Sequence, residues 1–139
     1  MPAHHLKIKL IEEKEIKMNT VNLAGRLTKD IELNEYGKGK DKGYFTRFTL
    51  AVRDGVDKDG EPRTQFISCI CWGKGSELLK KYCGKGDLIG VVGKIEENNY
   101  EDDEGVKHYT TQVNVRDIEF LGLKKEEQEE EQPRKKYKK

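Results

Sequence analysis

Residues 65–75 read QFISCICWGKG, and their side chains alternate in the way that a strand requires. The stretch holds two of the three cysteines of the chain and its only tryptophan. Alternation puts one small apolar set on one face, namely Ile67, Cys69 and Cys71, and the other set on the opposite face, namely Phe66, Ser68, Ile70 and Trp72. A buried free cysteine behaves as a small hydrophobe, which suits the interior of a tight barrel. We therefore expect the thiols inside and Phe66, Ile70 and Trp72 outside, partly exposed.

This outer face has two interpretations that the stretch alone leaves open. Exposed aromatic rings flanked by Arg and Lys are how proteins stack unpaired bases, at roughly 1–3 kcal/mol per base. The alternative is that the face packs against a partner subunit or a covering loop. At ~3.3 Å per residue, Phe66 and Trp72 stand about 20 Å apart along the strand.

The same two-residue period recurs on both sides of this stretch. In residues 21–27, VNLAGRL, one face carries Val21, Leu23 and Leu27, and Gly25 at the same parity suits a bend or a close backbone approach. In residues 44–53, YFTRFTLAVR, one face carries Tyr44, Thr46, Phe48, Leu50 and Val52, and the other carries Phe45, Arg47, Thr49, Ala51 and Arg53. Two further strands are expected over 87–95, where Gly90 and Gly93 allow curvature, and over 110–122.

Loops and one helix connect these strands. Residues 54–63 read as a hairpin loop and 98–109 as a long hairpin tip. Residues 73–86, GKGSELLKKYCGKG, predict a short helix with Ser76 as its N-cap and Gly84 as its stop. The order is three strands, one short helix and two strands. It predicts an all-β fold, a five-stranded OB-fold barrel with the helix between strands 3 and 4, in preference to a sandwich fragment.

Both ends of the chain are charged. We divide it into an N-terminal appendage over 1–17, helical or disordered, a barrel domain over 18–122, and a disordered tail over 123–139 that is almost free of apolar side chains. The domain carries 16 Lys and Arg against 18 Asp and Glu, so a binding surface has to come from sorting of charge between faces. No secretory signal or membrane-length apolar run appears, and an odd number of cysteines disfavours a disulfide framework. A cytosolic protein without membrane contact is expected.

Sites for metals, cofactors and catalysis are disfavoured. Zinc would need Cys69, Cys71, Cys83 and His108, but Cys69 and Cys71 are separated by one residue and no second ligand pair follows. An EF-hand register on Gly60 puts Gly55 and Phe66 at ligand positions. No phosphate-loop or nucleophile-elbow spacing is present. We expect no enzyme activity, no metal and no cofactor.

Five segments, in order and with similar spacing from about Met18 to Gly122, carry a resemblance to a known family. They are VNLAGRLTKDIEL (21–33), FTRFTLAVRD (45–54), QFISCICWGK (65–74), GKGDLIGVVGKI (84–95) and NYEDDEGVKHYTTQVNV (99–115). Together they resemble the bacterial-type single-stranded DNA-binding proteins. The resemblance implies an OB-fold homotetramer that wraps single-stranded DNA without reading its sequence.

The resemblance also implies site residues. Three aromatic positions for base stacking are filled by Phe66, Trp72 and Tyr100, whereas a fourth falls near Val56, which cannot stack. Basic residues should follow the phosphates, and alternation turns Arg26, Arg47 and Arg53 outward. Others lie in or beside loops, namely Lys58, Arg63, Lys74 and Lys107. The acidic run 101–104 would repel a phosphate backbone, so the DNA strand should run along the base of that hairpin.

The expected function is binding and protection of single-stranded DNA in replication, recombination and repair. An RNA-binding OB-fold protein and an assembly factor using the same outer face remain alternatives. The chain ends in PRKKYKK instead of the acidic tip finishing in Pro-Phe through which relatives recruit replication and repair proteins. Recruitment through that tip is therefore not expected, and a phage or plasmid origin would fit this departure.

Overall fold

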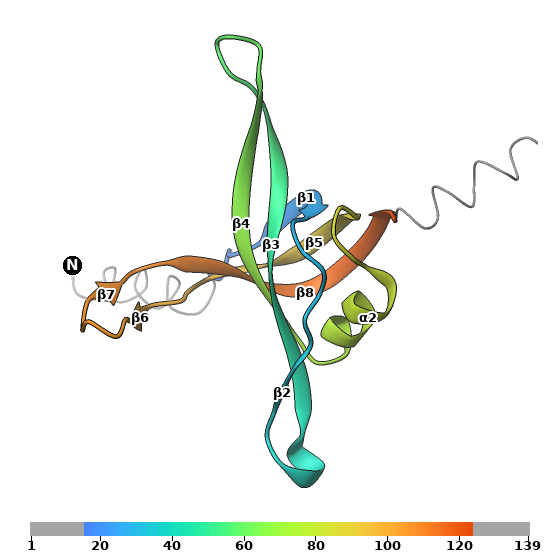
Figure 1. Ribbon diagram of the computed structural model, residues 1–139, viewed down its shortest axis with the longest axis vertical. Coiled ribbons are helices and arrows are strands. Elements are labelled where there is room, and N and C mark those ends of the chain that lie inside the picture. The colour runs from blue at the N-terminus through green and yellow to red at the C-terminus, as the bar shows by residue number, and fades with distance from the viewer. Residues whose placement is uncertain (1–15, 124–139) are drawn as a thin grey trace, which may run out of the picture.

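The computed structural model describes residues 16–123. These residues form long strands, short paired segments and one α-helix (Figure 1). The five long strands are β1 (Val21–Leu27), β3 (Gly43–Val56), β4 (Pro62–Trp72), β5 (Leu88–Glu97) and β8 (Thr111–Gly122). The other elements are β2 (Asn34–Tyr36), the 3-10 turn η1 (Gly39–Asp41), α2 (Lys74–Tyr82), β6 (Tyr100–Glu101) and β7 (Lys107–His108). The predicted order of five strands with a helix between the third and fourth is confirmed.

The strand pairings close on themselves. The sheet runs β1-β5-β8-β4-β3-β2, and β1 also pairs with β3. β1 therefore bridges both sides, and the five long strands form a ring of pairings as in an OB-fold barrel. At the crossing, a Cβ on Gly25 would lie 2.5 Å from the carbonyl oxygen of Ala51. The close backbone approach predicted for Gly25 is thus present.

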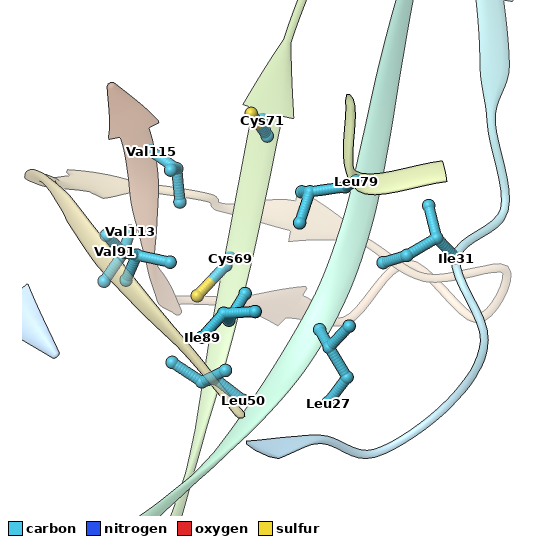
Figure 2. Close-up of a cluster of buried hydrophobic side chains, with 10 residues drawn as sticks. All are labelled: Leu27, Ile31, Leu50, Cys69, Cys71, Leu79, Ile89, Val91, Val113 and Val115. Atoms are coloured by element: carbon cyan, nitrogen blue, oxygen red, sulfur yellow. The ribbon is translucent and has the colours of Figure 1, made fainter. Parts of the chain in front are cut away.

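The core follows the predicted alternation. Buried side chains come from every long strand, from the loop after β1 and from α2, as Figure 2 shows for Leu27, Ile31, Leu50, Cys69, Cys71, Leu79, Ile89, Val91, Val113 and Val115. Leu79 is completely buried, so α2 contributes one side of its surface to the core. Leu123 after β8 is also buried, so packing continues to the last described residue.

The start of α2 differs from the prediction, because Ser76 is not its N-cap. The N-cap is Gly73, whose φ of 69° favours glycine, and no side chain caps the helix. Ser76 is buried in the first turn and its hydroxyl donates to the Gly73 carbonyl at 2.5 Å. The positive φ at Gly73 starts the helix three residues before the residue with the better capping side chain. The helix ends at Tyr82, and Gly84 follows the C-cap Cys83.

Two hairpins and one edge strand extend from the barrel (Figure 1). The β3–β4 hairpin rises as a long arm, with residues 57–61 as its loop, and the predicted hairpin over 98–109 is present with β6 and β7 as its paired segments. β2 pairs with the start of β3, and the sequence analysis did not predict it. The expectations for residues 1–17 and 123–139 lie outside the described residues, except at Ile16, Lys17 and Leu123.

Candidate nucleic-acid interface

The two faces of β4 differ as the sequence predicts. Cys69 and Cys71 are each 2 % exposed, whereas Phe66 is 68 % exposed and Trp72 45 %. Burial raises the pKa of the Cys69 thiol to about 12 and that of Cys71 to about 11. The thiols are therefore neutral core side chains, and the large rings face outward.

Ile70 is a correction to the predicted outer face. It was expected to be partly exposed, but it is only 1 % exposed. Its strand neighbours explain this burial, since Ile70 pairs with Arg47 of β3 on one side and with Asn114 of β8 on the other. A residue in the middle of the sheet, with a paired strand on each side, becomes covered even outside the barrel. This outer-face row continues to Lys94 of β5, which pairs with Asn114.

Trp72 belongs to an aromatic cluster. It is the cross-strand partner of Phe45, with ring centroids 4.8 Å apart and planes tilted by 32°. Tyr36 of β2 meets the indole edge-on at 5.3 Å and lies 6.2 Å from Phe45. The guanidinium carbon of Arg47 lies 5.7 Å from the centroid of the Phe45 ring. The cluster leaves the indole nearly half exposed and held by two other rings.

Phe66 and Arg26 lie on one row across three strands. Phe66 pairs with Ala51 of β3, and Ala51 pairs with Arg26 of β1. Cross-strand partners project from the same side of a sheet, so Arg26 is on the side of Phe66, as predicted. The Arg26 guanidinium also donates to the carbonyl oxygen of Gly86 at 2.8 Å, which fixes its orientation.

A groove of about 320 Å³ runs beside this face. The loop after β1 forms one wall, including Lys29, and the base of the β5–β8 hairpin forms another through Asn98 and Gln112. Its floor includes Arg47 and Ser68 from the outer face of β3 and β4. The barrel wall, the loop and the hairpin base thus form a groove that the acidic residues Asp30 and Glu32 also line.

The two arginines of the β3–β4 arm lie on opposite faces of the hairpin. Arg53 pairs with Thr64 and shares the side of Phe66, as expected. Arg63 has the opposite parity on β4 and lies 4.0 Å from the Asp54 carboxylate. It is therefore not brought onto the face of Phe66. Val56, near the position where the resemblance implies a fourth aromatic, is 61 % exposed close to the end of the arm.

The remaining predicted lysines are exposed and lie apart from one another. Lys58 lies in the loop of the β3–β4 arm, and Lys74 opens α2 two residues after Trp72. Lys107 of β7 pairs with Glu101 of β6, so it lies on the opposite side of that hairpin from the Tyr100–His108 pair.

Tyr100 is 53 % exposed, and its ring stacks on that of His108, with centroids 4.8 Å apart and an angle of 15°. His108 Nε2 lies 2.8 Å from Asp102 Oδ2. This hydrogen bond, followed by those from the backbone N–H groups of Val106 and Glu104, lowers the pKa of Asp102 below its ordinary value.

Sequence reasoning missed three residues of this surface. Tyr36 gave no signal because a three-residue strand is too short for a periodic pattern. Phe45 was placed on the outer side but was not named as part of a binding face. Lys94 could have been found, since Ile89, Val91 and Gly93 are buried at alternate positions and turn Lys94 outward.

Among residues 16–123, no group of three or more His, Cys, Asp or Glu side chains is arranged to hold a metal ion. Within the same range, the only α-helix is too short to cross a membrane.

Comparison with known proteins shows one family. The Single-strand binding protein family matches residues 18–121. The chain is 41 % identical over 104 residues to a single-stranded DNA-binding protein of Clostridium tetani, covering 75 % of this chain and 70 % of that protein. It is 39 % identical over 105 residues to the Enterococcus faecalis protein of the same name, covering 75 % of this chain and 54 % of that protein. It is 38 % identical over 105 residues to single-stranded DNA-binding protein 1 of Streptococcus pyogenes, covering 75 % of this chain and 78 % of that protein. The chain belongs to the single-strand binding protein family.

Proposed function

We propose that this protein binds single-stranded DNA without sequence readout, through the outer face of β3 and β4 and the neighbouring hairpin. One observation carries the proposal, namely that Phe66 and Trp72 are exposed on a strand whose alternate residues are buried thiols. Exposing two large rings costs a folded protein apolar burial, and a stacking ligand offsets that cost. Family membership and the names of the relatives support the same ligand.

Phe66, Trp72 and Tyr100 are the proposed stacking residues. Every base has a π-face, so rings at fixed positions bind bases of any sequence. Trp72 ends β4, and Phe66 lies six residues earlier on the same face, about 20 Å away at ~3.3 Å per residue. Tyr100 lies on the β6–β7 hairpin. The groove beside Arg47 and Ser68 lies between the loop after β1 and the hairpin base and offers a route for the strand between them.

Phosphate contacts are proposed for the basic residues around this route. Arg26, Arg47 and Arg53 share the side of the stacking rings, and Lys94 lies on the same row as Arg47. Lys58, Lys74 and Lys107 would contribute from the arms and from the start of α2. Arg63 would contribute only by leaving Asp54, because the two side chains already form an ion pair.

The biological role follows as part of the same proposal. The protein coats single-stranded DNA during replication, recombination or repair in the cytoplasm, carries out no chemistry, and assembles as the homotetramer that the family resemblance implies. Partly unpaired strand edges offer a physical route to self-association.

The test is direct binding of the full-length protein to three labelled ligands of equal length, oligo-dT, oligo-U and duplex DNA, measured by fluorescence anisotropy over a range of salt. We expect oligo-dT to bind tightest, duplex DNA to bind weakly, and the oligo-dT affinity to fall as salt rises. Tighter binding of oligo-U would favour the RNA-binding alternative. No binding of any ligand would overturn the proposal and favour an assembly factor that uses the same face.

A further inference from the structure

The phenol ring of Tyr100 is covered on one side only. The β6–β7 hairpin pairs Tyr100 with His108, and their rings lie nearly parallel with centroids 4.8 Å apart. The Tyr100 side chain is still 53 % exposed, so its other face remains open to solvent. A base that stacks there becomes the first layer of three, above the phenol and the imidazole.

The imidazole is itself fixed by the turn of the hairpin. Asp102 Oδ2 lies 2.8 Å from Nε2 of His108. The other carboxylate oxygen, Oδ1, accepts hydrogen bonds from the backbone N–H groups of Glu104 at 3.0 Å and Val106 at 2.9 Å. The turn therefore holds the carboxylate, the carboxylate orients the imidazole, and the imidazole supports the phenol.

The charges around His108 come from its own hairpin. Within residues 16–123, β6 and β7 pair only with each other. The neighbouring charged side chains are Asp102, Glu101 and Lys107, with Asp103 and Glu104 in the turn. Four of these five groups are acidic, so this hairpin offers a DNA strand ring stacking and not attraction by charge.

We propose that His108 is a positioning residue for Tyr100, because its imidazole holds the phenol in place for stacking on a base of single-stranded DNA. The inference rests on the proposed function and adds a residue to it. A phenol that is already held in one orientation loses little conformational entropy when a base stacks on its open face.

The experiment compares variants that separate the two properties of the side chain. His108→Phe keeps a ring that can stack on Tyr100, and His108→Gln keeps a hydrogen-bond donor to Asp102 without a ring. The control is His108→Gln in a Tyr100→Ala background, where the imidazole has no phenol to support. Oligo-dT affinity is measured for each full-length protein at pH 7, together with a thermal unfolding curve.

His108→Phe should bind oligo-dT about as tightly as wild type, and His108→Gln should bind about two- to tenfold more weakly, the range expected for one lost ring–ring contact. In the Tyr100→Ala background, His108→Gln should cause no further loss. A His108→Gln variant that equals wild type, or one that loses as much affinity with Tyr100 absent as with it present, overturns the inference. Loss of oligo-dT binding by the wild-type protein would instead overturn the proposed function.

Discussion

Phe45 and Trp72 are cross-strand partners on the outside of the barrel, and their ring centroids lie 4.8 Å apart. Tyr36 completes the contact by meeting the indole edge-on at 5.3 Å. The indole is thus held in one orientation while 45 % of its surface stays exposed. A fixed aromatic side chain loses little conformational entropy when a base stacks on it, so this arrangement favours binding more than a freely rotating ring would.

Replacing this indole should weaken DNA binding and leave the fold intact. Trp72→Ala removes a stacking surface worth roughly 1–3 kcal/mol, so oligo-dT affinity should fall by about 5- to 150-fold. The core remains, because Trp72 is not among its buried members. The measurement is anisotropy with labelled oligo-dT, together with a thermal unfolding curve.

The matched control for that experiment is Tyr82→Ala. Tyr82 is 49 % exposed on α2, outside the proposed DNA face, and its ring centroid lies 6.0 Å from that of Phe120. It should leave oligo-dT affinity unchanged. An equal loss in both variants, or a Trp72→Ala protein that does not fold, would mean that the indole serves the barrel and not a ligand.

Arg47 should contribute through phosphate neutralisation. It is exposed between the Phe45 ring and the groove, and it pairs across the sheet with Ile70. Arg47→Gln should weaken oligo-dT binding and reduce the slope of log affinity against log salt by about 0.7, the value for one contact on a single strand. Lys81→Gln on α2 is the control and should leave the slope unchanged. If the slope of Arg47→Gln equals that of the wild-type protein, a phosphate contact by Arg47 is excluded.

Gly93 should be essential to closure of the barrel. A Cβ at this position would lie 2.1 Å from the carbonyl oxygen of Asn114, so β5 and β8 would have to move apart. Gly93→Ala should lower the free energy of unfolding by about 1–3 kcal/mol or more. Gly90→Ala on the same strand is the control, because its nearest contact would be an ordinary 3.4 Å to Leu121 Cδ1. Equal melting temperatures for the two variants would contradict the close approach.

The thiols should report the integrity of the fold. Burial raises the pKa of Cys69 to about 12 and those of Cys71 and Cys83 to about 11. Because thiolates are the reactive species, the native protein should react slowly with a thiol reagent at pH 8, and unfolded protein should react at all three positions. Rapid labelling of Cys69 in folded protein would show that β4 has the opposite sidedness.

The raised pKa values of the thiols also make the free energy of unfolding depend on pH. Each folded thiol keeps its proton at pH values where the unfolded thiol, with an ordinary pKa of 9.0, loses it. The stabilisation is therefore complete below about pH 9 and is lost progressively as pH rises from there to the folded values of about 11 to 12. The free energy of unfolding, measured with denaturant, should be lower at pH 10 than at pH 8. Cys69→Ala should reduce this difference.

Periodicity predicted the part of this protein that depends on local alternation. Each strand segment carries its own two-residue period. That period predicts the inward thiols, the outward Phe66 and Trp72, and the strands themselves. Gly25 was also predictable, because a glycine at a core parity has no side chain to bury and signals close approach of another strand.

The remaining features depend on contacts that no single segment reveals. Ile70 is covered because β8, more than forty residues later, pairs alongside β4 in parallel. The start of α2 depends on a positive φ at Gly73, which overrides the capping preference of Ser76. The support of Tyr100 by His108 depends on the register of a hairpin whose turn is fixed by Asp102.

The most direct test uses the emission of Trp72, the only tryptophan in the chain. Titrating the wild-type protein with oligo-dT should quench this emission saturably, because bases stack on the exposed indole, and added salt should reverse the effect. Duplex DNA at the same concentration should leave the emission nearly unchanged. An emission that stays constant while anisotropy shows oligo-dT to be bound would contradict the central claim that the outer face of β4 receives the DNA.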